Sequence, residues 1–546
     1  MASHKIVIDG NNLKIKDVVA VARGKMVNGK PVYPVVELDP DAKKQIDRVR
    51  KYIEDNWLTE GADAYYGFNT GCGKLKDYRL STEEIDEFNK SYIRAHCVGT
   101  GDLLPKDVVR ASLLLRANTF AKGYSGIRSD LVIKILELLN KDVIPAVPEL
   151  GSLGASGDLA PLAYMAAVII GEEQAHAFYG GKKMKALDAL KMAGIEPLSL
   201  KAKEAMSFTN GSTVSLAVCC LLSADAVNML QIADVVASLS LEAMRCEKAA
   251  FDSKIHQLRK HSGQFQSARN IRKLTDSSEW MTEEARQEWS KKVSQEGKES
   301  SPRVQDAYSI RCLPSVHGSC RDSLNYLNQT ISVEINSAID SPLVFQTDSG
   351  YEMLNGGNFF GQQLAISSDL LAIAMVKIGQ ISERRTFRLL NPAFSFGLPD
   401  QLTGDKPGVN TGLMVAHYAQ AAILSKCKVL ASPASIHSEV TSGGQEDIVS
   451  MSLTSALKAA EILEHTFSIL ATELFCAFQG TVLARKILGD RPMGKGTQIV
   501  FDYIASHLKE IKKDRYLHDD LQQARELLTS SQLLDKVEDL LMVEES

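Results

Sequence analysis

Three long apolar stretches constrain the fold of this 546-residue chain more than any other feature. Residues 214–250, 364–388 and 453–477 carry apolar side chains at helical spacing, and none of the three contains a proline. Such a pattern predicts long α-helices. Because helices of this length and apolarity usually form the centre of a bundle shared between subunits, we expect a mainly α fold, a long-helix bundle, in a homo-oligomer.

The N-terminal part mixes two kinds of secondary structure. Residues 5–22 predict a short strand, a turn and a helix, and Asn28-Gly29 predicts the turn of a hairpin. Further helices are expected at 41–56, 81–96, 106–122, 129–140 and 165–177. We therefore divide the chain into an N-terminal domain with a small mixed α/β part (1–205), a central bundle (206–500) with a charged, solvent-facing excursion (269–303), and a helical tail (501–546).

The composition argues against polyanionic partners. With 62 basic and 67 acidic residues the formal net charge is −5, so no attraction to nucleic acid or anionic membranes is expected, and a small-molecule ligand is favoured. The nine cysteines are an odd number without C-x-x-C spacing, which indicates reduced thiols in a cytoplasmic protein and no zinc site. No run approaches ~20 uninterrupted apolar residues, so no membrane span is expected.

Two motif-like segments carry little weight. Residues 489–497 nearly spell a phosphate-binding loop, but Gly496 replaces the required hydroxyl residue and a helical segment comes first. His256 and His261 do not share a helical face, so a metal pair is not expected. Neither nucleotide nor metal binding is therefore predicted.

One segment of the N-terminal domain combines flexible glycines with small side chains. Residues 151–162 read Gly-Ser-Leu-Gly-Ala-Ser-Gly-Asp-Leu-Ala-Pro-Leu and lead into an apolar run that predicts the start of a buried helix. Small residues of this kind allow two backbone segments to touch. An ordinary helix start, with Ser156 or Asp158 as the N-cap, accounts for these residues as well.

The whole segment resembles the signature of the histidine and aromatic amino acid ammonia-lyases and aminomutases. The resemblance implies the fumarase/aspartase-like helical fold of that superfamily. It also implies that Ala155, Ser156 and Gly157 cyclise and lose water to form 4-methylidene-imidazol-5-one (MIO), with no metal or external cofactor. The residues suit this chemistry, because the unhindered nitrogen of Gly157 has to reach the Ala155 carbonyl and Ser156 supplies a hydroxyl that leaves as water. A helix N-terminus beside the electrophile would stabilise the negative charge that the electrophile takes up.

A glycine-rich loop at 65–73 has the composition of a lid. Within it, Tyr66 matches the tyrosine that serves this family as catalytic base. Since a free tyrosine has a pKa near ~10, this role requires a site that lowers the pKa. Taken alone, the residue could equally be a surface aromatic.

The other family matches are spread along the chain. In the block 304–312, Arg311 matches the arginine that binds the substrate carboxylate, a task that suits a planar forked donor, and Tyr308 and Gln305 match residues that line the site. Asn210 matches the asparagine that hydrogen-bonds the electrophile or the bound amine, and Glu446 matches the residue that faces the amine. Without the resemblance, an Asn-Gly turn and a helix cap would explain these last two positions.

The implied substrate depends on three side chains. Glu446 and His96 fit the histidine lyases, although some tyrosine enzymes also carry a histidine at the second position. Gln362 departs from the histidine lyases, which usually have glutamate there. The resemblance therefore implies deamination of L-histidine to trans-urocanate, with a tyrosine or phenylalanine lyase or aminomutase as one alternative and an inactive helical scaffold as another. By family analogy the protein is a homotetramer whose sites draw on several subunits.

Overall fold

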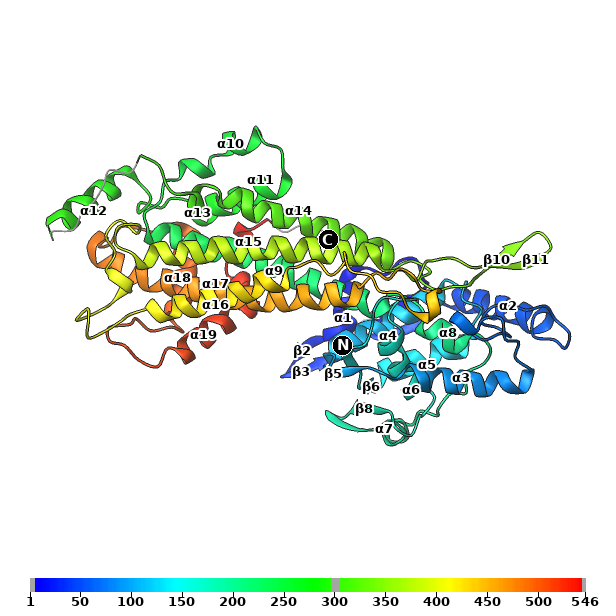
Figure 1. Ribbon diagram of the computed structural model, residues 1–546. Helices are drawn as coiled ribbons and strands as arrows, with labels where there is room; N and C mark the ends of the chain where they lie inside the picture. Colours follow the sequence, from blue (N-terminus) through cyan, green and yellow to red (C-terminus); the bar gives the residue numbers. More distant parts are fainter. Residues whose placement is uncertain (1–4, 296–303, 543–546) are drawn as a thin grey trace.

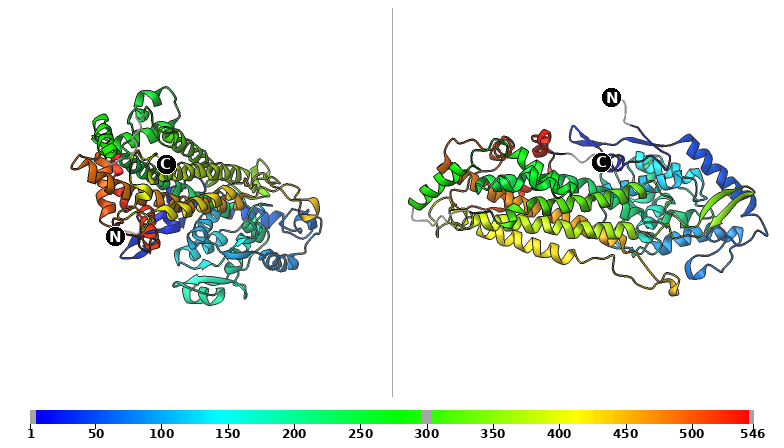
Figure 2. Two further views of the ribbon diagram at one scale, coloured as in Figure 1. Left: turned by 60° about the vertical axis from the view of Figure 1, so that its left-hand side comes forward. Right: turned by 90° about the horizontal axis from the view of Figure 1, so that it is seen from above.

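The computed structural model describes residues 5–295 and 304–542, and long helices that run side by side dominate it (Figures 1 and 2). They are α9 (Thr213–Ala243), α14 (Leu313–Glu334), α15 (Gln362–Leu390), α16 (Met414–Leu430) and α17 (Ser452–Leu488). The α17 helix packs against α9, α15 and α16, and its faces are mostly buried. The predicted mainly α bundle is confirmed, because the three apolar stretches form α9, α15 and α17, although α9 ends at Ala243 and leaves residues 244–250 of the first stretch outside the helix.

The core of the bundle also holds paired charges. The Asp234 carboxylate of α9 accepts hydrogen bonds from Nδ1 of His317 at 2.7 Å and from Nη2 of Arg321 at 2.8 Å, both on α14. Burial raises the pKa of Asp234, but Arg321 and His317 outweigh it and hold the pKa at about 2. Because slipping one helix would leave a buried charge unpaired, such pairs fix how the helices align.

Three of these helices are long and apolar enough to cross a membrane. In the bundle, however, the most apolar 18-residue stretch of each helix is mostly buried inside the protein. The buried share of that stretch is 78% in α9, 67% in α15 and 89% in α17. The apolar side chains of all three therefore serve the protein core.

Shorter elements form the N-terminal part at one end of the bundle (Figure 1). Its helices are α1 (Ile15–Arg23), α2 (Pro40–Asn56), α3 (Thr82–His96), α4 (Lys106–Ala121), α5 (Ser129–Asn140), α6 (Leu159–Ile169), α7 (Ala186–Ala193) and α8 (Glu204–Thr209). Strand β1 (Lys5–Ile8) pairs in parallel with β4 (Val35–Leu38), and β2 (Lys25–Val27) forms a hairpin with β3 (Lys30–Val32). The predicted first strand, the hairpin and the four helices between 41 and 140 are thus confirmed.

The helix predicted at 165–177 is confirmed only as far as Ile169, and its remaining part is wrong. The α6 helix ends at Ile169, where Gly171 adopts a φ of 68°, and β8 (His176–Tyr179) follows. Strand β8 pairs with β6 (Ile144–Pro145) and β9 (Lys182–Lys185), while β5 (Thr100–Leu103) pairs with β7 (Pro148–Leu150) and β10 (Leu343–Thr347) with β11 (Gly350–Leu354). These strands are too short for an alternating pattern to reveal them in the sequence.

The charged segment at 269–303 is less exposed than predicted. Part of it forms α11 (Ser262–Leu274) and α12 (Glu283–Gln295), and residues 296–303 lie outside the described residues. Two of its tryptophans are buried: the indole N–H of Trp280 donates to the Arg491 carbonyl at 2.7 Å, and that of Trp289 donates to the Phe396 carbonyl. These contacts attach the segment to the end of the bundle, beside α10 (Ser253–Gln257), α13 (Tyr308–Arg311) and α18 (Lys495–Ala505).

Residues 489–497 are organised around a carboxylate of the protein itself. Glu242 of α9 accepts hydrogen bonds from the Gly494 amide and the Thr497 hydroxyl, both at 2.9 Å, at the start of α18. The side chain thus takes the position in which a phosphate-binding loop would hold an anion. Past this point the chain ends in α19 (His518–Thr529) and α20 (Gln532–Asp535).

Candidate active site

The tripeptide Ala155-Ser156-Gly157 lies where four helices begin. It is followed by α6, and α9 starts just after the neighbouring Gly211. The amide of Met451, directly before α17, donates to the Leu153 carbonyl at 2.9 Å, and Gly361, directly before α15, faces Ser212 and Ser452. Helix N-termini carry partial positive charge, so this position favours negative charge that develops at the tripeptide.

The backbone of the tripeptide is clamped against Gly211. The Gly211 amide donates to the Ser156 carbonyl at 2.9 Å, and the Asp158 amide donates to the Gly211 carbonyl at 2.9 Å. A Cβ atom added to Gly157, which has a φ of 88°, would lie 2.2 Å from the Gly211 carbonyl carbon. The close backbone approach predicted from the small residues is therefore present, and only glycine fits there.

Asp158 does not cap its own helix, although it precedes α6. Its buried carboxylate accepts hydrogen bonds from the Ser215 amide at 2.7 Å, the Ser215 hydroxyl at 2.9 Å and the Ser152 hydroxyl at 3.0 Å. Burial raises the pKa of this carboxyl group. The sequence-based alternative of an ordinary N-cap is therefore wrong for Asp158, whose side chain fastens the tripeptide loop to α9.

A cavity of about 710 Å³ opens over Ser156. Its lining includes five of the predicted site residues, which are Tyr66, His96, Ser156, Asn210 and Glu446. Side chains that the sequence did not single out also line it, among them Cys72, Tyr92, Met206 and Phe359. The structure thus brings together residues that are up to 380 positions apart, the separation of Tyr66 and Glu446 (446 − 66).

The phenol of Tyr66 is half-buried in this cavity and accepts a hydrogen bond from the Gly73 amide at 3.2 Å. Burial raises the pKa of Tyr66; the Gly73 hydrogen bond opposes that effect, and Cys72 and Glu446 add to it. Lys76 is the one lysine or arginine among the described lining residues. The lowered pKa that a catalytic base requires is therefore not supplied within one chain.

His96, at the end of α3, is held in one tautomer. Its Nδ1 atom lies 2.6 Å from the Tyr92 carbonyl oxygen, and since a carbonyl can only accept, Nδ1 carries the proton. The imidazole also stacks on the Tyr92 ring with centroids 3.9 Å apart. Burial lowers the pKa of His96, so the ring is neutral at pH 7 and its Nε2 atom is a hydrogen-bond acceptor.

Glu446 and Asn210 are far apart in the sequence, but both line the cavity with Ser156. The Glu446 carboxylate accepts a hydrogen bond from the Thr441 hydroxyl at 2.9 Å, and its other oxygen lies 3.5 Å from the Ser156 hydroxyl. The Asn210 side-chain amide donates to the Ser341 carbonyl at 2.9 Å, which fixes its orientation.

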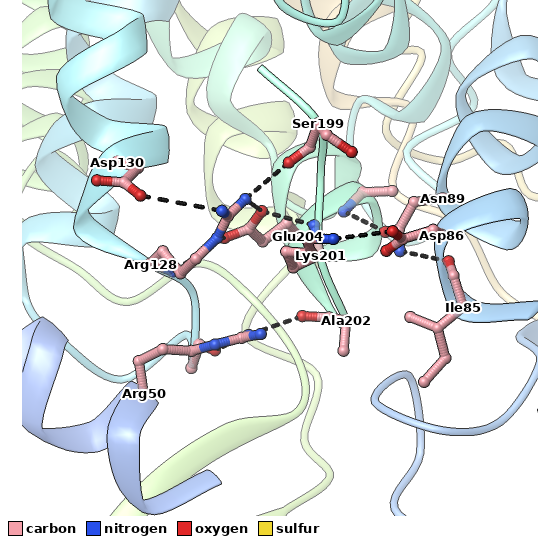
Figure 3. A network of polar contacts seen from close by, with 12 residues as sticks. Arg50, Ile85, Asp86, Asn89, Arg128, Asp130, Ser199, Lys201, Ala202 and Glu204 are labelled. Carbon is pink, nitrogen blue, oxygen red and sulfur yellow. Dashed lines mark hydrogen bonds and ion pairs between the residues drawn. The ribbon is translucent and has the colours of Figure 1, made fainter. Parts of the chain in front are cut away.

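A network of polar contacts anchors α8, the short helix that ends at Asn210 (Figure 3). The Glu204 carboxylate, fully buried at the start of α8, accepts hydrogen bonds from Nε and Nη2 of Arg128 at 2.9 and 2.7 Å. Arg50 donates to the Ala202 carbonyl at 2.9 Å, and the Ala205 amide donates to the Asn89 side chain at 3.1 Å. Fork-like charged contacts of this kind are rigid, so Asn210 is presented to the cavity from a fixed support.

The remaining predicted residues do not line this cavity. Gln305 and Tyr308 are exposed, and Nε of Arg311 donates to the Asp306 carbonyl at 2.6 Å. Asp306 in turn accepts from the Glu247 amide beyond the far end of α9, whose 31 residues span about 45 Å. Figure 1 shows α13 at the opposite end of the bundle from α8. Arg311 therefore cannot reach Ser156 of its own chain.

Gln362 lies at the first position of α15, near the tripeptide. Its side-chain amide donates to the Ser435 carbonyl at 3.5 Å, and the residue is not part of the cavity lining. Gln362, the residue at which this sequence differs from the usual glutamate of the histidine lyases, therefore does not line the cavity of its own chain.

Comparisons with known proteins identify the family to which this chain is similar. The family described as aromatic amino acid lyase matches residues 13–506. The histidine ammonia-lyase of Alkaliphilus oremlandii is 40% identical over 534 residues, which cover 98% of each chain. The crystal structure of histidine ammonia-lyase from Trypanosoma cruzi superposes with a TM-score of 0.85 at 31% identity, covering 98% of this chain and 96% of that one. The tyrosine aminomutase of Streptomyces globisporus superposes with a TM-score of 0.88 at 30% identity, covering 99% and 100%.

Proposed function

The chain belongs to the aromatic amino acid lyase family, a family of carbon–nitrogen lyases, and from this premise we propose that it eliminates ammonia from L-histidine to give trans-urocanate. The observation that carries the proposal is the cavity that Tyr66, His96, Asn210 and Glu446 line together with Ser156. The relatives named histidine ammonia-lyase, similar over nearly their whole length, support the substrate.

The family uses MIO, and we assign its precursor here to Ala155, Ser156 and Gly157. The fit rests on the contact between Gly157 and Gly211, which is so close that an added Cβ atom would clash. When formed, the group supplies an electrophile for the substrate amine. Activation of this kind is needed because acid–base catalysis alone contributes only about 10²–10⁴ in rate.

The protein side chains then bind and orient histidine. Nε2 of neutral His96 accepts a hydrogen bond from the substrate imidazole, and the Glu446 carboxylate faces the substrate ammonium group. Tyr66 removes the proton from the β-carbon, in keeping with its place in the cavity lining. Its phenolate needs a nearby cation, because burial raises its pKa within one chain.

A tyrosine or phenylalanine enzyme, lyase or aminomutase, is the second candidate. It is favoured by the close structural likeness to a tyrosine aminomutase and by Gln362, where histidine lyases usually have glutamate. A phenol could use the same His96 acceptor as an imidazole.

Product analysis separates these candidates. We expect purified enzyme given histidine, tyrosine and phenylalanine in parallel to form urocanate and ammonia from histidine with the highest kcat/KM, because Nε2 of His96 accepts from the imidazole N–H while Glu446 faces the ammonium group. Chromatography of the products is the measurement. Coumarate or cinnamate without urocanate would refute the histidine assignment, and a β-amino acid would show an aminomutase.

We further propose a cytoplasmic homotetramer whose sites take Arg311, Tyr308 and Gln305 from a second copy of the chain. The cavity of one chain offers no arginine for the substrate carboxylate among its described lining residues. Apolar side chains remain exposed along the bundle, at Ile366, Leu370 and Ile373 on α15 and at Val415 and Tyr418 on α16. Stripes of this kind are typical of subunit interfaces. An arginine from a partner would also lower the pKa of Tyr66.

Complementation tests this sharing. Ser156→Ala and Arg311→Ala chains, each inactive or nearly so by itself, are expected to regain activity when co-expressed. In mixed tetramers, an intact Ser156 on one subunit then meets an intact Arg311 on another. Steady-state turnover of the doubly tagged assembly is measured. If that activity does not exceed the mean of the two single variants, the proposed sharing of Arg311 between subunits is refuted.

A further inference from the structure

Arg116 on α4 is a fully buried guanidinium that none of the assignments above uses. Its Nη1 atom donates to the Asn210 carbonyl at 2.5 Å and to the Thr213 hydroxyl at 3.0 Å. Among the described residues, its Nε and Nη2 atoms have no hydrogen-bond partner. Burial lowers its pKa to about 10, which leaves it charged at neutral pH.

The acidic groups nearest to this cation are engaged elsewhere. Asp340 and Asp158 act on Arg116 electrostatically, but Asp340 pairs with Lys203 at 3.3 Å, and Asp158 accepts from Ser215. Keeping a buried charge without a contacting carboxylate is costly, so its position invites a functional explanation. Its direct contacts are the Asn210 carbonyl, the Thr213 hydroxyl and the Phe120 ring, whose centroid is 4.7 Å away.

Two peptide units connect Arg116 to the tripeptide. The Asn210 carbonyl that accepts from Arg116 belongs to the same peptide unit as the Gly211 amide, and that amide donates to the Ser156 carbonyl at 2.9 Å. The Ser156 carbonyl, in turn, belongs to the same peptide unit as the Gly157 nitrogen. Hydrogen bonds in such a chain polarise one another, by about 10–30% per bond.

We propose that Arg116 is a positioning residue for maturation of the tripeptide, acting through the Asn210–Gly211 peptide to polarise the Ser156 carbonyl. The inference rests on the proposed function, because it presupposes that Ala155, Ser156 and Gly157 cyclise. It assigns a role to a side chain that touches neither the substrate nor the reacting atoms.

The chemistry of maturation shows where this polarisation acts. The Gly157 nitrogen forms a bond to the Ala155 carbonyl carbon, and its proton ends on the carbonyl oxygen. This hydroxyl and the Ser156 amide proton leave together as the first water, and a C=N bond forms between the Ala155 carbonyl carbon and the Ser156 nitrogen. The Ser156 Cα proton and hydroxyl leave as the second water, which makes a C=C bond, so two waters are lost and no oxidant is required.

The second water is the step that Arg116 assists. Removing the Ser156 Cα proton places negative charge on the adjacent Ser156 carbonyl oxygen. The Gly211 amide donates a hydrogen bond to this oxygen. The Arg116 guanidinium makes that amide a stronger donor, because it donates to the carbonyl of the same peptide unit. Preorganised donors of this kind stabilise developing charge at no cost of reorganisation.

Intact mass followed after a pulse of synthesis tests the proposal. The wild-type chain is expected to lose the mass of two waters. Arg116→Gln keeps a donor for the Asn210 carbonyl but removes the charge, and we expect its loss of two waters to be about 10-fold slower, less than the 10²–10³ that follows removal of an oxyanion donor outright. Arg116→Lys, which keeps a cation, is expected to mature faster than Arg116→Gln. Near-ultraviolet absorbance provides an independent readout.

The matched control is Arg110→Gln on the same helix. Arg110 is also buried, but it donates to the Val21 carbonyl and to Asp142, away from the tripeptide. We expect this variant to mature at the wild-type rate even where it lowers stability. If Arg116→Gln folds poorly, the comparison of Arg116→Lys with Arg110→Lys decides, with slower maturation expected for Arg116→Lys alone.

The possible results distinguish a failure of the role proposed for Arg116 from a failure of the proposed function. Arg116→Gln chains that accumulate after the loss of one water support the proposal, whereas chains that keep their full encoded mass are blocked before the assisted step and overturn it. Maturation of Arg116→Gln at the wild-type rate, or of Arg116→Lys no faster than Arg116→Gln, overturns it and leaves the proposed function standing. A wild-type chain with its full encoded mass overturns the proposed function, and this inference with it.

Discussion

Replacing Ser156 with alanine is expected to abolish turnover while the fold and the assembly stay intact. The substitution removes the hydroxyl that leaves as the second water, so no electrophile can form. Acid–base catalysis by the remaining residues supplies only about 10²–10⁴ in rate, which leaves the reaction too slow to detect. The closest polar contact of the hydroxyl, with Glu446, is 3.5 Å long, so little stability depends on it.

Three measurements check this expectation. Initial rates with histidine give the loss of turnover, circular dichroism and light scattering report the fold and assembly, and intact mass shows whether two waters have been lost. Ser323→Ala, which removes a partly exposed hydroxyl on α14, is the control and should match the wild type in all three. Undiminished turnover by Ser156→Ala would refute the assignment of the tripeptide.

Tyr66→Phe is expected to lower kcat by about 10²–10⁴, the range that general acid–base catalysis contributes. The ring still fills its place in the loop, and only the phenol oxygen and its hydrogen bond to the Gly73 amide are lost. Because Tyr66 does not take part in cyclisation, the variant should still lose two waters. KM should change little, since the phenol removes a proton and does not anchor the substrate.

The neighbouring tyrosine offers a matched control. Tyr65 stacks on Trp57 with ring centroids 4.6 Å apart and is not part of the cavity lining. Tyr65→Phe should therefore keep the wild-type kcat. A Tyr66→Phe enzyme with normal kcat would show that another group removes the β-proton, and one that retains its full encoded mass would point to a fault in maturation instead of catalysis.

The sequence by itself determined the long helices of the bundle and pointed to the family to which the chain belongs. Residues 214–250, 364–388 and 453–477 specify α9, α15 and α17 because helical periodicity is a local property, visible wherever the pattern is long. The motif at 151–162 was recognisable for the same reason, since it is a run of neighbouring residues of fixed type. Tyr66, His96, Asn210 and Glu446 each lay in a short motif, although nothing in the sequence says that they meet. The domain boundaries at 205 and 500 stay predictions.

Only the tertiary structure decided how distant segments use these residues. It turned the Asp158 carboxylate to Ser215, it buried Trp280 and Trp289 of a segment that reads as solvent-facing, and it separated Arg311 from Ser156 by the length of α9. It also linked Arg116 to the tripeptide; an arginine inside the apolar run of α4 was the one sign of this in the sequence. For Asp158, the two tryptophans and Arg116 the physical reason is the same: a buried polar group must find a partner somewhere, but its type says only that a partner is needed, and three-dimensional packing determines which one.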